Sequence, residues 1–196
     1  MENINYVCDY LKKSIETKRL LLEDVDLLDR VSMAATMIED AYKNNKKVLI
    51  AGNGGSAGDA QHIAAELVSR FFYDRPGLPA IALTTDSSML TAIGNDYGFE
   101  KIFSRQVQAQ GISGDIFIGI STSGNSENVI KAVHEAKKMG LKTIGLTGQS
   151  GDLPNIVDIS LNVPSASTPF IQECHICIGH ILCAIVEKNI FPKSAL

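Results

Sequence analysis

The feature that most constrains the fold of this chain is a change in its hydrophobic pattern at Lys47. From that residue on, short and continuously apolar runs alternate with Gly-rich turns and amphipathic stretches. Continuous apolarity is typical of strands that are covered on both faces, and the alternation is typical of a parallel sheet between two layers of helices. We therefore predict an α/β fold, a three-layer α/β/α sandwich with a five-stranded parallel sheet. Its predicted strands are Val48–Ala51, Ala80–Thr84, Ile116–Ile120, Thr143–Leu146 and Ile159–Val163.

The segment before the sheet is predicted to be helical. Residues 4–44 contain neither Gly nor Pro, and apolar side chains recur there at the spacing of an amphipathic helix. Two helices are expected, with more apolar surface than one small sheet can cover, so part of them is predicted to contact another subunit. At 196 residues the chain is expected to form a single domain, 1–196, with a helical arm at 1–45 and an α/β core at 46–196.

Within the core, helices are predicted after the first, third and fifth strands. The Asp-, Ser- and Gly-rich residues 85–98 are predicted to form a loop after the second strand. In such folds ligands bind at the carboxyl ends of the strands, near the point where the connections reverse direction. The segments that follow the strands are therefore the candidates for a functional site.

Charge and hydropathy argue against several classes of partner. Eighteen basic and 22 acidic residues give a net charge of −4, so the overall field does not attract nucleic acid or an anionic membrane. No run approaches the roughly 18 uninterrupted apolar residues of a membrane span, and residues 1–13 lack the apolar core of a secretion signal. A cytoplasmic protein is expected, with reduced thiols at its four cysteines.

The first predicted strand runs into a glycine-rich turn, Gly52-Asn53-Gly54-Gly55-Ser56. Small residues let the backbone turn sharply and point its amides at an anion at the start of the following helix. The turn lacks the Gly-Lys-Ser/Thr sequence of a nucleotide-binding P-loop and the Gly-x-Gly-x-x-Gly sequence of a dinucleotide site. It is therefore either a small-anion site or a tight turn that binds no ligand.

The third predicted strand ends in a cluster of hydroxyl side chains. Ser121, Thr122, Ser123 and Ser126 precede a predicted amphipathic helix over Val129–Met139. Hydroxyls, unpaired backbone amides and the helix dipole together favour an anion there without any lysine. A helix cap needs one hydroxyl, whereas this segment supplies four, so a phosphate site is favoured over a serine-rich cap. Such an uncharged pocket suits a small phosphate monoester.

Two further segments place polar and titratable side chains at helical spacing. His62 and Glu66 are four residues apart and project from one face of the helix after the glycine-rich turn. Gln172 and His180 lie on a predicted helix near the end of the chain, about 80° apart around its axis, so we expect them to converge on one point. The four side chains would form a ligand set for a divalent metal such as zinc, or an acid–base pair with polar helpers. Spacing alone does not choose between these.

Other candidates have an equally ordinary explanation. Asn95 and Asp96 would bind sugar hydroxyls or form only an Asx turn. His175 is interpreted as a hydrogen-bonded structural histidine, because its neighbours are apolar or cysteine. Cys174 and Cys177 fall inside a helix without a second cysteine pair, so core packing is favoured over a redox or metal motif.

The ordered motifs resemble the sugar isomerase (SIS) domain family and, within it, the phosphoheptose isomerases. The resemblance covers most of the chain and is more specific than any one loop. The motifs that carry it are Gly52–Ser56 with Asp59–Glu66, Gly94–Phe99, Ser121–Ser126 and Ile171–His175.

The resemblance implies a flavodoxin-like sheet, a homotetramer with sites between subunits, and one zinc ion per subunit. It also implies the isomerisation of sedoheptulose 7-phosphate to D-glycero-D-manno-heptose 7-phosphate through an enediol. This is the first step of ADP- or GDP-heptose biosynthesis for lipopolysaccharide or capsule. Carried over by position, the phosphate would be held by Ser121, Thr122, Ser123 and Ser126. The sugar would be bound by Asn53, Gly54, Gly55, Glu66, Asn95, Asp96 and Gln172.

The family's zinc pattern would fall on His62, Glu66, Gln172 and His180. In the implied reaction Glu66 is the base and His180 is the acid. The chain departs from the family at Pro169-Phe170, where many relatives have Ala-Arg or Asp-Arg, so the exact sugar phosphate stays open. Two alternatives remain: a non-catalytic SIS adaptor that binds the replication initiator DnaA, and an isomerase for a related capsule or nucleotide-sugar pathway. The intact Glu66/His180 pair favours an enzyme.

Overall fold

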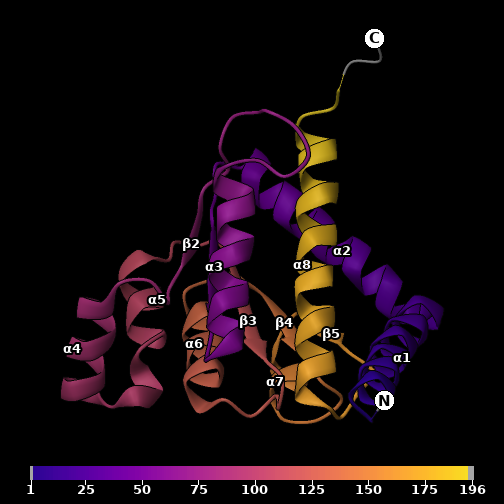
Figure 1. The fold of residues 1–196 in the computed structure, drawn as a ribbon. Helices are drawn as coiled ribbons and strands as arrows, with labels where there is room; N and C mark the ends of the chain where they lie inside the picture. The colour runs from indigo at the N-terminus through magenta and orange to yellow at the C-terminus, as the bar shows by residue number, and fades with distance from the viewer. Residues whose placement is uncertain (1, 194–196) are drawn as a thin grey trace.

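A computed structural model describes residues 2–193 and contains a sheet of five strands (Figure 1). All neighbouring strands are parallel, in the order β2-β1-β3-β4-β5. The strands are β1 Val48–Gly52, β2 Ala80–Ala82, β3 Ile116–Ser121, β4 Lys142–Thr147 and β5 Ile159–Asn162. The parallel sheet predicted from the apolar runs is confirmed.

Helices cover both faces of this sheet, as predicted (Figure 1). α2, α3 and α8 share an apolar core with Ile50 and Ile118 on one face, and α5, α6 and α7 share a second core with Leu49 and Phe117 on the other. Successive residues of a strand point to opposite faces, which is why Leu49 and Ile50 enter different cores. The helices are α1 Glu2–Glu23, α2 Val25–Lys43, α3 Gly55–Val68, α4 Ser87–Tyr97, η1 (a 3-10 helix) Phe99–Lys101, α5 Ser104–Gln110, α6 Glu127–Lys138, α7 Leu153–Ile156 and α8 Thr168–Ile190.

The prediction of a loop over residues 85–98 is wrong, because most of this segment forms α4. The carboxylate of Asp86 accepts a hydrogen bond from the Met89 amide at 2.8 Å and caps the helix. Gly98 follows the last helical residue with a φ of 93°, a conformation that favours glycine. The Asp and Gly residues that suggested a loop are thus the start and stop signals of a short helix.

The chain leaves the sheet toward opposite layers after β1 and β3. These two strands are neighbours, and α3 follows β1 on one face whereas α6 follows β3 on the other. Their carboxyl ends therefore form the switch point at which α/β folds bind ligands. The glycine-rich turn 52–56 and the hydroxyl-rich turn 121–126 both lie there.

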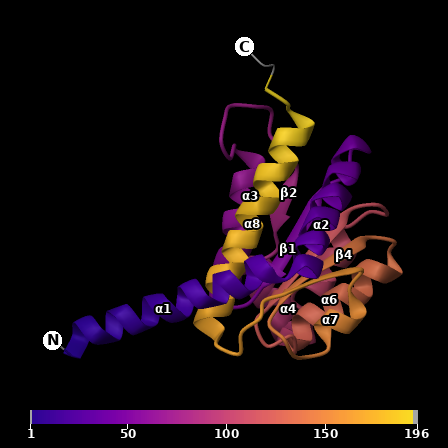
Figure 2. The same cartoon turned by 90° about the vertical axis from the view of Figure 1, so that its right-hand side faces the viewer.

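The N-terminal arm consists of two helices, as predicted, and α1 extends away from the rest of the molecule (Figure 2). Tyr10 and Lys18 each donate a hydrogen bond to the carboxylate of Glu173 on α8, at 3.1 and 3.0 Å, and Ser14 also bonds this carboxylate. Several apolar side chains of α1 are more than half exposed, among them those of Ile4, Val7, Leu11 and Ile15. Their contact with another subunit stays a prediction.

α8 is long and apolar enough, by length and composition alone, to cross a membrane. Half of its most apolar stretch is buried within the protein, where it packs against α2 and α3 (Figure 1). The apolarity of α8 is thus explained by its place in one of the two cores.

Candidate active site

The two loops at the switch point are joined by a pair of amide side chains. Asn53 in the first loop and Asn128 in the first turn of α6 each donate a hydrogen bond to the other, at 2.8 and 2.9 Å. Asn128 is buried. The pair fixes the loops relative to each other and leaves Asn53 one N–H and one lone pair for a ligand. Asn128 was not among the predicted site residues, and its position directly after the serine cluster is its one sequence signal.

Two glycines of the first loop occupy positions where a side chain would be strained or would collide with a neighbour. Gly54 has a φ of 54°, in the left-handed region that favours glycine. A Cβ atom at Gly55 would lie 2.5 Å from the amide nitrogen of Gln172, so a side chain there would displace Gln172. The start of α3 and the first turns of α8 therefore meet closely beside this loop.

The hydroxyls after β3 face one another. The Ser121 hydroxyl lies 2.9 Å from that of Ser126 and 3.4 Å from that of Ser123, and Thr122 is in the same turn. Although Ser126 directly precedes α6, its side chain forms no capping hydrogen bond with that helix. The hydroxyls of Ser123 and Ser121 accept hydrogen bonds from the amides of Asn125 and Ser126, at 3.2 and 3.4 Å, and so keep their own hydrogens for a ligand. The cluster lies at the N-terminus of a 12-residue helix, whose dipole favours an anion.

A carboxylate and two imidazoles meet between α3 and α8. The Nε2 atom of His62 lies 3.1 Å from Nε2 of His180 and 3.3 Å from Oε1 of Glu66. The side chains of His62 and Glu66 are 48% and 28% exposed, so solvent and a small ligand can reach them. The cluster depends on close helix packing, because a Cβ atom at Gly179 would lie 2.7 Å from the side chain of Ile63.

Two distances in this cluster match the separation of donor atoms around one metal ion. Ligands of a tetrahedral zinc ion at about 2.0–2.1 Å are separated from one another by about 3.3 Å, close to the 3.1 and 3.3 Å observed. Among residues 2–193, however, no group of three or more His, Cys, Asp or Glu side chains is placed to hold a metal ion. His62 therefore lies at ligand spacing from each of the other two side chains, and a full ligand set would need a further arrangement of these groups.

Gln172 forms no hydrogen bond with this cluster among the described residues. Its amide lies against Gly55, at the start of α3, whereas His62 is seven residues further along that helix. Gln172 and His180 are eight positions apart, which corresponds to a rise of about 12 Å along α8. The convergence of both side chains on one point, and Gln172 as a fourth ligand, stay predictions.

Comparison with known proteins gives the family. A family model described as SIS domain matches residues 9–148, which include both loops, His62 and Glu66. The chain belongs to the SIS domain family. It is 56% identical to Phosphoheptose isomerase 2 of Campylobacter jejuni, over 99% of this chain and 98% of that protein. It is also 56% identical to the phosphoheptose isomerase of Aneurinibacillus thermoaerophilus, over 97% of this chain and 96% of that protein.

Solved structures of SIS-domain relatives have the same fold over nearly the whole length. A phosphoheptose isomerase from Francisella tularensis superposes with a TM-score of 0.91 at 42% identity, covering 96% of this chain and 100% of that chain. The phosphoheptose isomerase GmhA from Neisseria gonorrhoeae superposes with a TM-score of 0.88 at 43% identity, covering 94% and 98% of the two chains. These relatives extend over α8, which lies beyond the matched family model, so the SIS fold predicted from the motifs is confirmed.

In residues 2–193, the two predicted sugar-binding residues on α4 form no hydrogen bond with the two loops or with the cluster of His62, Glu66 and His180. Asn95 and Asp96 are exposed near the end of this helix, and the amide of Asn95 donates to the carboxylate of Asp96 at 2.8 Å. Within the described part of the SIS domain, no hydrogen bond joins either side chain to the two loops. Their role in sugar binding stays a prediction.

Burial shifts the pKa of one side chain on α3 and one on α8. Asp59 lies one turn before His62, one of its oxygens is buried without a hydrogen-bond partner among the described residues, and burial raises the pKa of Asp59 to about 6. Burial also lowers the pKa of His175 to about 4, although a contact with the backbone of Thr147 acts in the opposite direction. His175 is therefore neutral at physiological pH, and it is fully buried, as expected for a structural histidine.

Proposed function

We propose that this SIS-domain protein is an aldose–ketose isomerase that converts sedoheptulose 7-phosphate into D-glycero-D-manno-heptose 7-phosphate. The observation that carries the proposal is the meeting of Glu66 from α3 and His180 from α8 around His62. Such an isomerisation needs a base that removes a proton from carbon and an acid that serves the neighbouring oxygen. The full-length relatives at 56% identity bear the name phosphoheptose isomerase, which supports the same substrate class.

The substrate is anchored by its phosphate group after β3. The helix dipole of α6 and its free N-terminal amides balance the negative charge, and the hydroxyls donate hydrogen bonds to the phosphate oxygens. The hydroxyls proposed for this role are those of Ser121, Thr122, Ser123 and Ser126. The sugar hydroxyls are proposed to contact Asn53, Gly54, Gly55, Asn95, Asp96 and Gln172.

Glu66 and His180 move the protons. Glu66 removes a proton from C1 of the open-chain ketose, and His180 donates a proton to the carbonyl oxygen on C2, which gives the enediol. Glu66 then returns its proton to C2 while His180 accepts the proton of the C1 hydroxyl, which leaves an aldehyde at C1. Both side chains end in their starting protonation states.

We infer that zinc is the resident metal of this site, with one ion per subunit. His62, Glu66 and His180 would hold it, since imidazole and carboxylate are donors that zinc accepts and His62 lies close to both other side chains. Gln172, whose amide nitrogen lies beside Gly55, would be the fourth ligand. A bound zinc ion would polarise the carbonyl group of the substrate.

The active form is proposed to be a cytoplasmic homotetramer. The apolar side chains exposed along α1 need a covering surface, and a second copy of the arm would supply one (Figure 2). The aldose phosphate that forms would enter ADP- or GDP-heptose biosynthesis for lipopolysaccharide or capsule.

The test is proton exchange in deuterated water. The wild-type protein should incorporate deuterium beside the carbonyl of sedoheptulose 7-phosphate, and Glu66→Gln should lower turnover and exchange about 100-fold or more. Glu135→Gln on α6 is the matched control, since Glu135 pairs only with Lys138, at 3.7 Å, among the described ion pairs. A Glu66→Gln protein with full exchange would remove this mechanism.

A further inference from the structure

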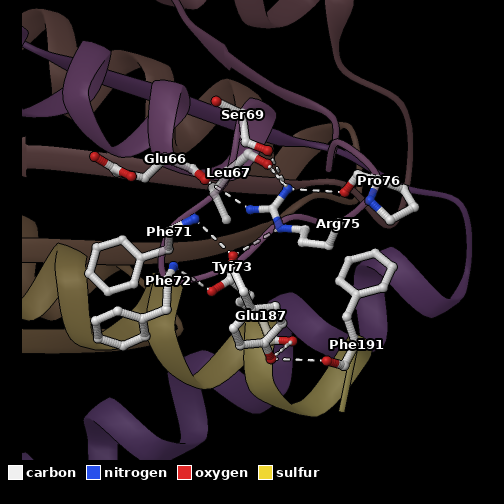
Figure 3. A network of polar contacts seen from close by, with 10 residues as sticks. All are labelled: Glu66, Leu67, Ser69, Phe71, Phe72, Tyr73, Arg75, Pro76, Glu187 and Phe191. Atoms are coloured by element: carbon white, nitrogen blue, oxygen red, sulfur yellow. Dashed lines mark hydrogen bonds and ion pairs between the residues drawn. The ribbon is translucent and has the colours of Figure 1, made fainter. Parts of the chain in front are cut away.

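The loop between α3 and β2 is held by a buried ion pair (Figure 3). The Nε atom of Arg75 in this loop lies 3.1 Å from a carboxylate oxygen of Glu187 near the end of α8. Their side chains are 2% and 0% exposed. Buried ion pairs are costly to desolvate and persist where further hydrogen bonds satisfy both partners. The contacts of each partner therefore show what the pair holds in place.

Arg75 holds the end of α3. Its guanidinium donates to the carbonyl oxygens of Leu67 at 2.6 Å, Glu66 at 2.8 Å, Pro76 at 3.0 Å and Ser69 at 3.2 Å (Figure 3). The last carbonyl groups of a helix lack partners inside it, and Glu66 and Leu67 belong to that last turn of α3. The backbone of the proposed base is thus bonded directly to Arg75.

Glu187 holds the start of the same loop. Its two carboxylate oxygens accept hydrogen bonds from the consecutive amides of Phe71 and Phe72, each at 2.7 Å (Figure 3). Burial acts to raise the pKa of Glu187, but these amides and Arg75 together hold it below the ordinary value. Glu187 is therefore a carboxylate with all its bonds directed at one loop.

The direction of this loop decides where two aromatic rings lie. The Phe71 ring packs against His180, with 5.5 Å between ring centroids, whereas Phe72 is 73% exposed. Because the carboxylate fixes both amides, Phe71 is turned toward the proposed acid. The pair thus contacts the backbone of Glu66 on one side and the neighbour of His180 on the other.

We propose that the Arg75–Glu187 pair positions the acid–base site. Arg75 holds the backbone of Glu66, and Glu187 holds the backbone of Phe71 so that its ring packs against His180. This role rests on the proposed isomerase function. In the described contacts the pair forms no hydrogen bond with the hydroxyl-rich turn 121–126, which is the proposed phosphate cradle, or with the glycine-rich turn 52–56. Its loss should therefore lower kcat and leave KM within about twofold, because a reacting group displaced by about 1 Å can cost about 100-fold in rate.

The chain offers a matched control at the other end of the sheet. Asp115 is fully buried, accepts hydrogen bonds from the amides of Lys47 and Ile112 at 3.0 Å, and pairs with Nζ of Lys47 at 2.6 Å. It thus repeats the chemistry of Glu187, one cation and two amides. It directly precedes β3, at the amino end of the strand, whereas the site lies at the carboxyl end.

The experiment compares Glu187→Gln with Asp115→Asn in the full-length protein. Both variants should lower the unfolding temperature, and only Glu187→Gln should lower kcat, by about 10- to 100-fold. A second readout needs no turnover: the ring signals of the four histidines in the NMR spectrum. The His180 signals should shift in Glu187→Gln and, in the same direction, in Phe71→Leu, which leaves the ion pair intact.

The outcomes separate this inference from the proposed function. If Glu187→Gln and Asp115→Asn have equal kcat values and unchanged His180 signals, the pair only stabilises the fold and the positioning role is overturned. If Glu187→Gln does not fold, Phe71→Leu decides, since unchanged kcat and His180 signals there would overturn the role. If the wild-type protein does not isomerise heptose phosphates, the proposed function fails, while the His180 signals still test the placement of Phe71.

Discussion

Replacement of Ser121 by alanine tests the phosphate cradle at its central member. Ser121 is buried, and its hydroxyl contacts those of both Ser123 and Ser126. The substitution removes a donor to the phosphate and the 2.9 Å partner of Ser126. A hydrogen bond to a charged group is worth about 1.5–3 kcal/mol, and about 1.4 kcal/mol is a factor of ten. We therefore expect KM for the sugar phosphate to rise about 10- to 100-fold.

The assay combines steady-state kinetics with calorimetric titration of inorganic phosphate. Affinity for phosphate should fall by a similar factor, and kcat should change less than KM, because the cradle binds the end of the substrate that does not react. Ser160→Ala is the control, since Ser160 lies on β5 and its buried hydroxyl has no partner among the described residues. A Ser121→Ala protein with wild-type KM and phosphate affinity would refute the cradle, as would an equal loss in Ser160→Ala.

Three further predictions concern other parts of the site. Asn128→Ala removes both bonds to Asn53 and should raise KM about 30-fold, at about 1 kcal/mol per bond, without lowering the unfolding temperature as far as a core cavity would. His175 has its pKa lowered from 6.5 to about 4, so only the unfolded chain binds its proton between these pH values. Its contribution to the free energy of unfolding should be lost as the pH falls from 6.5 to 4, and urea titrations of His175→Leu should show a weaker pH dependence there. Elemental analysis should find zinc in the wild-type protein and little in His62→Ala, and a wild-type protein without metal would contradict the proposed cofactor.

The parts of the fold that local sequence signals determine can be predicted. The apolar runs give the strands, and the small residues after Val48–Gly52 give the sharp turn in which Gly54 has positive φ. Local signals are ambiguous where one residue type has two roles. Asp86 suggests a loop and is in fact the cap of α4, because the same carboxylate serves turns and helix starts.

Contacts between distant segments carry no such signal. The Asn53–Asn128 pair spans 75 positions and the Arg75–Glu187 pair spans 112, so neither could be recognised without the packing of the layers. Gln172 lies on the predicted helix, α8, and the angle around that helix says nothing of the axial rise of about 12 Å between Gln172 and His180.

The same long separations determine when the site can exist during folding. His62 and His180 lie 118 positions apart, and their contact requires α8, the last helix of the chain, to dock on α3. Contacts so distant in sequence form late, after the entropy of closing a long loop has been overcome. A nascent chain therefore exposes a complete hydroxyl-rich turn well before it has a working acid–base pair. Recovery of enzymatic turnover after dilution from denaturant should consequently lag behind recovery of helical circular dichroism.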